Sequence, residues 1–185
     1  KGLIGELLFL KDKIIPKYGS ENGIKFWIGP EDAPQDFVVK MNAIEVKCQI
    51  GSTNPRVKIS SENQLYSQLS HLFLYVATLT KSPLSEKSIN LPKLVNEIEQ
   101  LFENPLSDGF RRFEDLLFQI GYEFNEKYNE FNYMFVEEQI FNVKEGFPRI
   151  IPEYYLTGVN RVSYNINLLD CKDFKLDLKD WKFND

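Results

Sequence analysis

Residues 34 to 49 read PQDFVVKMNAIEVKCQ, and they constrain the fold of this chain more than any other stretch. Two short runs, DFVVK and AIEVKC, mix apolar with charged residues in an alternating pattern, and a short turn separates them. Alternation with a period of two is typical of β-strands that bury one face. The segment therefore predicts an antiparallel β-hairpin, and so a fold that contains a sheet.

The register of this hairpin decides which side chains meet. A turn at residues 41–42 places Val38 opposite Glu45 and Asp36 opposite Lys47. Because opposed residues share a face, and so do residues two apart on one strand, the two acids and the lysine gather on one side. The apolar residues of both runs line the other side: Phe37, Val39, Ile44, Val46 and Cys48.

Two carboxylates and an amine on one face suit the binding of a hard divalent cation. Converging carboxylates repel each other unless a cation lies between them, and Mg²⁺ needs only one or two of them together with water. Asp36 and Glu45 would be the ligands, with the backbone carbonyl of Val46 as a neutral third, and Lys47 would stabilise negative charge beside the ion. The alternative is an ordinary solvent-facing hairpin in which Asp36 and Lys47 form a cross-strand ion pair.

The rest of the chain predicts alternating helices and strands. An amphipathic helix is expected over residues 3–15, ending at Pro16, followed by a strand over residues 24–30. Ser60 or Ser61 is placed to cap a short helix, and the continuous apolar run at 71–79 predicts a strand buried on both faces. Helices over 91–103 and 108–122, the second capped by Asp108, precede a β-rich last third. This order describes one α/β or α+β domain.

Composition excludes several classes of site. The net charge of −5 argues mildly against a nucleic-acid binder, although a cluster of metal-binding acids would itself be locally acidic. Two cysteines without a CxxC spacing give no zinc motif, and His71 is the single histidine. No run approaches the ~20 apolar residues of a membrane span. We expect a cytoplasmic protein, and because the chain starts at Lys1 inside an amphipathic pattern, we expect an N-terminal part to be missing.

A resemblance joins these residues to a known family. The run PQD followed by IEVK resembles the PD-(D/E)XK signature of the restriction-endonuclease-like superfamily, with Gln35 intervening between the proline and the aspartate. The ordered series GELLFL, GPEDAPQDFVV, IEVK, VKISSENQL and FPRI is similar to one uncharacterised family of bacterial PD-(D/E)XK motif proteins. The similarity extends over about residues 2 to 170. Such proteins are described beside restriction-modification or phage-defence genes.

The resemblance implies an α/β fold with an αβββαβ core, a mixed sheet flanked by helices, and C-terminal helices and extra strands. It implies one domain over residues 1–185, with the core at about 1–80 and an extension at about 88–170. The first helix would lend an acid to the site, a place that Glu6 matches. Gln64 matches the place where some relatives carry a polar helper; the alternative for both residues is a solvated side chain.

The function implied is that of a Mg²⁺-dependent endonuclease, in which Mn²⁺ can substitute, acting in restriction, phage defence or DNA processing. The expected substrate is DNA, although the residues do not decide between DNA and RNA. Arg56, Lys58 and Arg149 are candidate phosphate contacts, or else solvated surface charges. The implied partners are a second copy of the chain or proteins of a defence operon, and no membrane. The alternative function is a catalytically silent nucleic-acid-binding or assembly module of a defence complex.

Overall fold

The computed structural model describes residues 1–51, 53–154, 158–159 and 161–183. Its centre is a mixed sheet with the strand order β1-β2-β4-β5-β7, in which only β2 and β4 run parallel and the other neighbours are antiparallel. The strands are β1 (Phe37–Val39), β2 (Asn42–Ile50), β4 (His71–Lys81), β5 (Tyr133–Asn142) and β7 (Lys175–Leu176). A separate antiparallel pair consists of β3 (Arg56–Ile59) and β6 (Tyr164–Asn167).

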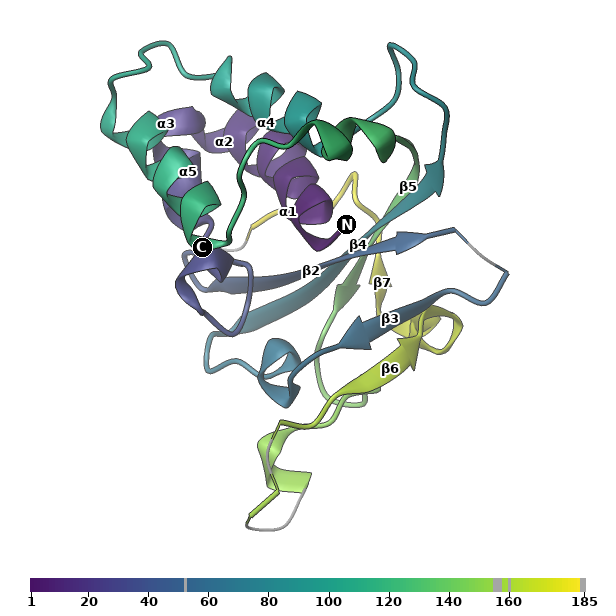
Figure 1. Ribbon diagram of the computed structural model, residues 1–185. Helices are drawn as coiled ribbons and strands as arrows, with labels where there is room; N and C mark the ends of the chain where they lie inside the picture. Colours follow the sequence, from purple (N-terminus) through teal and green to yellow (C-terminus); the bar gives the residue numbers. More distant parts are fainter. Residues whose placement is uncertain (52, 155–157, 160, 184–185) are drawn as a thin grey trace.

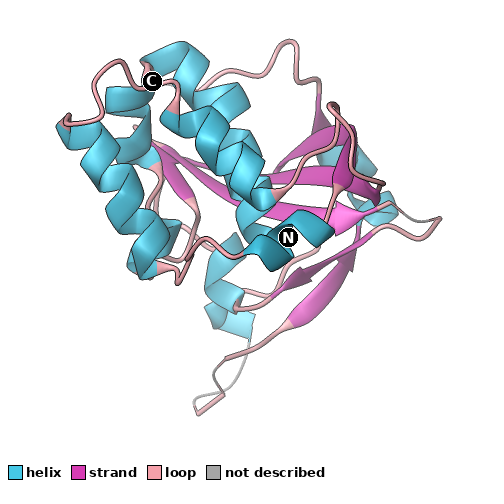
Figure 2. Cartoon of the chain, turned by 45° about the horizontal axis from the view of Figure 1, so that its top comes forward, coloured by secondary structure: helices cyan, strands magenta, loops and turns pink. Residues whose placement is uncertain are grey.

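Helices cover one face of the sheet, and the β3–β6 pair lies against the other (Figures 1 and 2). The helical layer contains α1 (Gly2–Phe9), α2 (Ile15–Tyr18), α3 (Ser20–Gly23), α4 (Leu91–Glu99) and α5 (Asp108–Gln119), with a π-helical stretch at Leu10–Ile14 between α1 and α2. Short 3₁₀ helices occupy Ile24–Phe26, Gly29–Glu31, Glu62–Leu65, Glu126–Glu130, Pro152–Tyr154 and Leu168–Phe174.

Strand β4 separates two hydrophobic cores. Phe73 and Tyr75 point to the core under the helices, whereas Leu74 and Val76 point to the core under the β3–β6 pair. All four side chains are at most 2% exposed, which confirms the prediction of a strand buried on both faces. The order α1, β1, β2, β3, a short helix at 62–65 and β4 confirms the expected αβββαβ core, and the fold class is α/β.

Three local expectations were wrong. Residues 24–30 do not form a strand: Ile24–Phe26 is a 3₁₀ helix, Trp27 makes a single antiparallel bridge to Phe37, and a second 3₁₀ helix begins at Gly29. Ile24 and Trp27, both fully buried, are joined by the i, i+3 hydrogen bond that closes the first of these turns. The first helix does not end at Pro16 but continues to Tyr18, since the π-helical stretch precedes the proline and Pro16 lies in the first turn of α2. The cap of α5 is Ser107, one residue before Asp108, and its hydroxyl accepts a hydrogen bond from the Phe110 N–H.

None of the helices in the described part of the chain is long and apolar enough to cross a membrane.

Candidate active site

The β1–β2 hairpin has a register different from the predicted one. Val38 lies opposite Ala43, not Glu45, and the turn is at residues 40–41, where Lys40 has a left-handed φ of 54°. The pairing is therefore shifted by two residues. An even shift leaves every side chain on its expected face, so the apolar set remains in the core and the polar set remains on the opposite side.

Asp36 immediately precedes β1, and its backbone and side chain are both held. Its carbonyl oxygen accepts hydrogen bonds from the N–H groups of Ile28 (2.9 Å) and Gly29 (3.0 Å). Its Oδ2 accepts one from the Val46 N–H on the neighbouring strand, at 2.7 Å. A Cβ on Gly29 would lie 2.9 Å from Oδ1, so glycine is needed for this close approach. Together these contacts aim the aspartate at β2.

Glu6 reaches the same place from the helical layer. A Cβ on Gly5 would lie 2.8 Å from the Cβ of Cys48, so the glycine allows α1 to pack directly on β2. The Trp27 indole Nε1 donates a hydrogen bond to Glu6 Oε2 at 2.9 Å, and Trp27 itself is fully buried. Glu6 is thus a half-buried carboxylate held by a rigid donor, and not a solvated helix glutamate.

Glu45 and Lys47 lie two residues apart on β2 and form an ion pair of 2.6 Å between Oε1 and Nζ. The Glu45 side chain is 1% exposed, and in the described part of the chain neither of its oxygens has a hydrogen-bond partner besides this ion pair. The alternative of a cross-strand pair between Asp36 and Lys47 is not realised, because Asp36 bonds to the β2 backbone instead.

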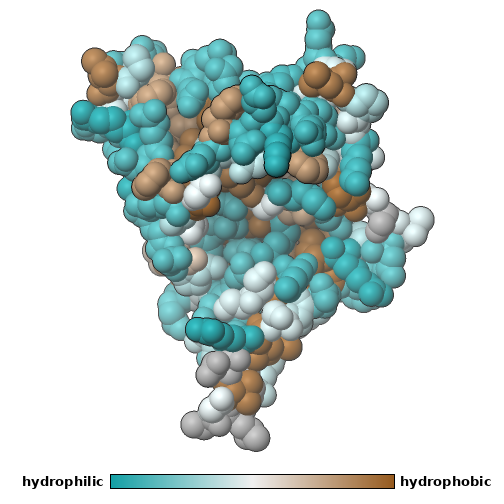
Figure 3. Space-filling view, viewed as in Figure 1, coloured by the Kyte–Doolittle hydropathy of each residue, from teal (hydrophilic) through white to brown (hydrophobic). Residues whose placement is uncertain are grey.

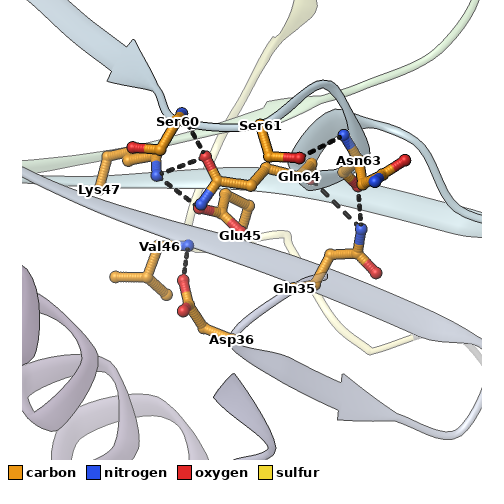
Figure 4. A network of polar contacts seen from close by, with 9 residues as sticks. All are labelled: Gln35, Asp36, Glu45, Val46, Lys47, Ser60, Ser61, Asn63 and Gln64. Atoms are coloured by element: carbon orange, nitrogen blue, oxygen red, sulfur yellow. Dashed lines mark hydrogen bonds and ion pairs between the residues drawn. The ribbon is translucent and has the colours of Figure 1, made fainter. Parts of the chain in front are cut away.

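Gln64 is fixed against Lys47 by its own backbone surroundings (Figure 4). Its Oε1 accepts hydrogen bonds from Lys47 Nζ at 3.0 Å and from the Ser60 N–H at 2.7 Å. Because a backbone N–H can only donate, the atom that faces it must be the amide oxygen. The short helix that carries Gln64 is capped by Ser61, whose Oγ accepts from the Asn63 N–H, as the sequence predicted for Ser60 or Ser61.

Gln35, the residue that intervenes in the signature, is a structural clamp that sequence reasoning missed. Its side chain is 5% exposed, and Nε2 donates to the carbonyl oxygens of Asn63 at 2.7 Å and Tyr66 at 2.9 Å, with that of Gln64 at 3.4 Å. It therefore ties the loop before Asp36 to the helix that carries Gln64. The signal in the sequence was the inserted residue itself, because a polar side chain next to a site acid needs a hydrogen-bond partner when it is buried.

The three acids, Lys47 and Gln64 line one cavity of about 250 Å³ beneath the N-terminal end of α1, whereas Gln35 lies outside it. Figure 3 shows a hydrophilic hollow between the helical layer and the β3–β6 pair. The cavity brings together nearly all of the predicted site residues: Glu6, Asp36, Glu45, Val46, Lys47, Gln64, Arg56 and Lys58. Arg149 does not line it; this residue lies in a neighbouring cavity, and its Nη1 donates to the Leu65 carbonyl at 2.6 Å.

The three acids of the cavity oppose one another's ionisation. Burial raises the pKa of Glu45 to about 7, although the ion pair with Lys47 opposes the shift. Burial, and then the charges of Glu45 and Glu6, raises the pKa of Asp36 well above its usual range. Burial also raises the pKa of Glu6, against the hydrogen bond from Trp27. Charging all of them at once is therefore costly unless a cation compensates.

The open edge of β2 adds a neutral oxygen to this set. The Val46 N–H points away from β4 to Asp36, and in a strand the N–H and C=O of one residue point to the same edge, so the Val46 carbonyl also faces that edge. As the side chains stand, no group of three or more His, Cys, Asp or Glu residues within the described ranges is gathered closely enough to form a metal cluster.

Comparison with known proteins agrees with this geometry. The sequence model of the family described as "Putative PD-(D/E)XK family member, (DUF4420)" matches residues 1–169. The chain matches no curated protein and no solved structure. The match extends from the helix that carries Glu6 to the end of the β3–β6 pair and includes every candidate site residue. The chain therefore belongs to this PD-(D/E)XK family, whose membership suggests a nuclease-like function.

Proposed function

We propose that the protein is a metal-dependent nuclease that hydrolyses phosphodiester bonds of DNA. The observation that carries the proposal is the convergence of Asp36, Glu45 and Lys47 with Glu6 in one cavity, although the first helix and the hairpin are separate elements. Buried carboxylates with raised pKa values that lie in a cleft are more typical of a functional site than of a structural one.

The cavity fits a divalent cation by its chemistry. All of its candidate ligands are oxygens, the kind that Mg²⁺ and Mn²⁺ prefer. The Glu45 carboxylate is almost fully buried and has only Lys47 as a partner in the described part of the chain, which is a costly state for a charged group. Asp36, Glu45 and the Val46 carbonyl would hold the ion, and Glu6 would complete the acidic wall. When bound, such an ion activates water and stabilises negative charge on a phosphate.

Lys47 would act directly on the reacting groups, and Gln64 would act through Lys47. The Lys47 ammonium lies beside Glu45 and carries three donors, so it can also hydrogen-bond the attacking water or a phosphate oxygen. Gln64 Oε1 accepts from Lys47 and so limits the positions that the amine can adopt. Because Gln64 is itself fixed by Ser60, its role is to position Lys47.

Arg56 and Lys58 would hold the nucleic-acid backbone. Both side chains are exposed at the wall of the cavity, and neither has an ion-pair or hydrogen-bond partner among the described residues. Free cations beside a catalytic cavity are suited to phosphate contacts, which supply most of the affinity for nucleic acids. The family resemblance supports a setting in restriction or phage defence in the bacterial cytoplasm.

The experiment is a cleavage assay on supercoiled plasmid, linear DNA and RNA, with Mg²⁺ or Mn²⁺ and with EDTA. The wild-type protein is expected to cut circular DNA, as an endonuclease does, only when the metal is present. Asp36→Asn, Glu45→Gln and Lys47→Met are expected to abolish cutting while the urea midpoint shows that they remain folded. Glu123→Gln, which changes an exposed acid outside the cavity, is the matched control.

Full cutting by Asp36→Asn or Glu45→Gln would overturn the proposed site. Binding of DNA without cutting by the wild type, with every metal, would favour the silent binding module instead. Cutting of RNA alone would keep the mechanism and change the substrate.

A further inference from the structure

A second and larger cavity, of about 580 Å³, adjoins the candidate active site. It lies between β6 and the segment 148–150, and Asp170 of the 3₁₀ helix at Leu168–Phe174 also lines it. Arg56 lines both cavities. A molecule that extends from the active site past Arg56 therefore enters the second cavity directly.

The β3–β6 pair presents a polar face at this boundary. Val57 and Ile166 pair with each other and are buried in the core on one side. Arg56 pairs with Asn167 and Lys58 with Asn165, so these four residues share the other face. The pair thus separates a hydrophobic face, which holds it to the sheet, from a face of two cations and two amides.

Hydrogen-bonding groups at the cavity remain free. Arg56 and Asn165 are exposed, and their side chains have no partner in the part of the chain that the structure describes. Arg149 uses one guanidinium nitrogen on the Leu65 carbonyl, which fixes the group and leaves its other N–H donors. Asp170 is the one carboxylate among the described residues that line the cavity. The cavity is therefore lined by two cations, by the amide of Asn165 and by an acid.

We propose that this cavity binds one unpaired nucleotide of the DNA strand that is cut, next to the phosphate in the active site. This inference rests on the proposed nuclease function. Arg56 contacts the phosphate that links the two positions, and the base enters the second cavity. Its volume lies within the range of pockets that enclose small organic ligands, and a concave site can only accept a base that has left the stack.

The polar groups also indicate which bases are preferred. A carboxylate accepts a hydrogen bond from the exocyclic amino group of cytosine, and an Asn side chain can both donate to and accept from adenine. Asn165 and Asp170 together therefore favour a base that carries an amino group over thymine, which has none. The cavity is in this way a determinant of cleavage position and not of catalysis.

The test measures, by fluorescence anisotropy in EDTA, the binding of short labelled oligo-dC, oligo-dA and oligo-dT. The wild type is expected to bind the first two more tightly than oligo-dT. Arg56→Ala should weaken the affinity for all three oligonucleotides about tenfold. Asn165→Ala should weaken the affinity for oligo-dC and for oligo-dA about tenfold. Asp170→Ala should reduce the difference in affinity between oligo-dC and oligo-dT. Lys87→Ala and Asn96→Ala are the matched controls, since both change an exposed residue outside the two cavities.

Equal affinity for the three strands, or variants that bind no more weakly than their controls, would overturn the nucleotide site. Deoxycytidine monophosphate is the further probe: if it binds as tightly as oligo-dC, the cavity takes a free nucleotide and the strand proposal falls. The two proposals fail separately. Unimpaired cutting by Glu45→Gln refutes the nuclease site. If Glu45→Gln loses cutting but Arg56→Ala and Asn165→Ala bind the oligonucleotides normally, only the role of the second cavity is refuted.

Discussion

Replacing Gln35 by glutamate keeps the length and shape of the side chain but removes its hydrogen-bond donors. In the native protein the Gln35 amide donates to the Asn63 and Tyr66 carbonyls at 2.7 and 2.9 Å. The ionised carboxyl of Gln35→Glu would instead place negative oxygens against carbonyl oxygens, at a position that is 5% exposed. Gln35→Met serves as the matched neutral variant, since it has a similar volume and no donor.

The expected magnitude follows from the two short bonds. Each net hydrogen bond contributes about 0.5–1.5 kcal/mol, so Gln35→Met should lower the free energy of unfolding by about 1–3 kcal/mol. Gln35→Glu should lower it further at neutral pH, because a buried unpaired charge is added. Burial raises the folded-state pKa of the introduced carboxyl above its unfolded value. The penalty of Gln35→Glu is therefore small at low pH, where the protonated acid can donate one bond, and grows as the pH rises.

Urea denaturation of the three proteins at about pH 5 and about pH 8 measures these differences. Cleavage assays measure the second consequence, because the clamp holds the helix whose Gln64 bonds Lys47. We expect both variants to lose about tenfold or more in cleavage rate from misplacement of Lys47. If Gln35→Glu were as stable as the wild type at about pH 8, or as active, the clamp would not act as the geometry indicates.

Three further changes test other parts of the structure. Gly5→Ala should lower the free energy of unfolding by about 1–3 kcal/mol, because its Cβ would lie 2.8 Å from the Cys48 Cβ. Gly2→Ala, whose Cβ meets nothing within 4 Å, should leave the free energy of unfolding unchanged. Equal stability of the two variants in urea denaturation would contradict the close packing of α1 on β2. In EDTA, stability should fall by about 3 kcal/mol as the pH rises from 4.5 to about 7, since folding raises the pKa of Glu45 over that interval and the folded state holds its proton more tightly. Glu45→Gln should remove the share of Glu45 from the pH dependence in urea titrations, whereas the shares of Asp36 and Glu6, whose pKa values burial also raises, should remain. An unchanged slope would count against the buried acid. Lys58→Ala should reduce the slope of log Kd for DNA against log salt concentration by about one, the change expected for one lost phosphate contact. Lys87→Ala is the control. A slope equal to that of the wild type would show that Lys58 does not contact DNA.

The amino-acid pattern predicted several local features of the strands correctly. Alternation in the hairpin assigns Glu45 and Lys47 to the face opposite Phe37 and Ile44, and the apolar run of β4 indicates burial on both faces; both features were confirmed. Asp36 instead lies before β1 and bonds the backbone at the open edge of β2. Such patterns are local, because side-chain direction in a strand follows directly from the position of the residue along it.

The pattern could not predict the hairpin register, because a shift of two residues preserves every face and so leaves the alternation unchanged. The left-handed turn at Lys40 and the bond from Val46 to Asp36 distinguish the two registers, and both depend on backbone geometry. The Gln35 clamp was missed for a related reason, since its partners are backbone carbonyls that have no signature in the sequence.

The sequence alone thus indicated which residues are candidates for the chemistry and which face of a strand they occupy, since both follow from residue type and local periodicity. Folding determined the distances: how closely α1 packs on β2 through Gly5, which donor holds Glu6, and where β3 meets β6 to form a second cavity beside the first. These contacts join segments far apart in the chain. Their geometry depends on the packing of whole layers, which no short stretch of residues specifies.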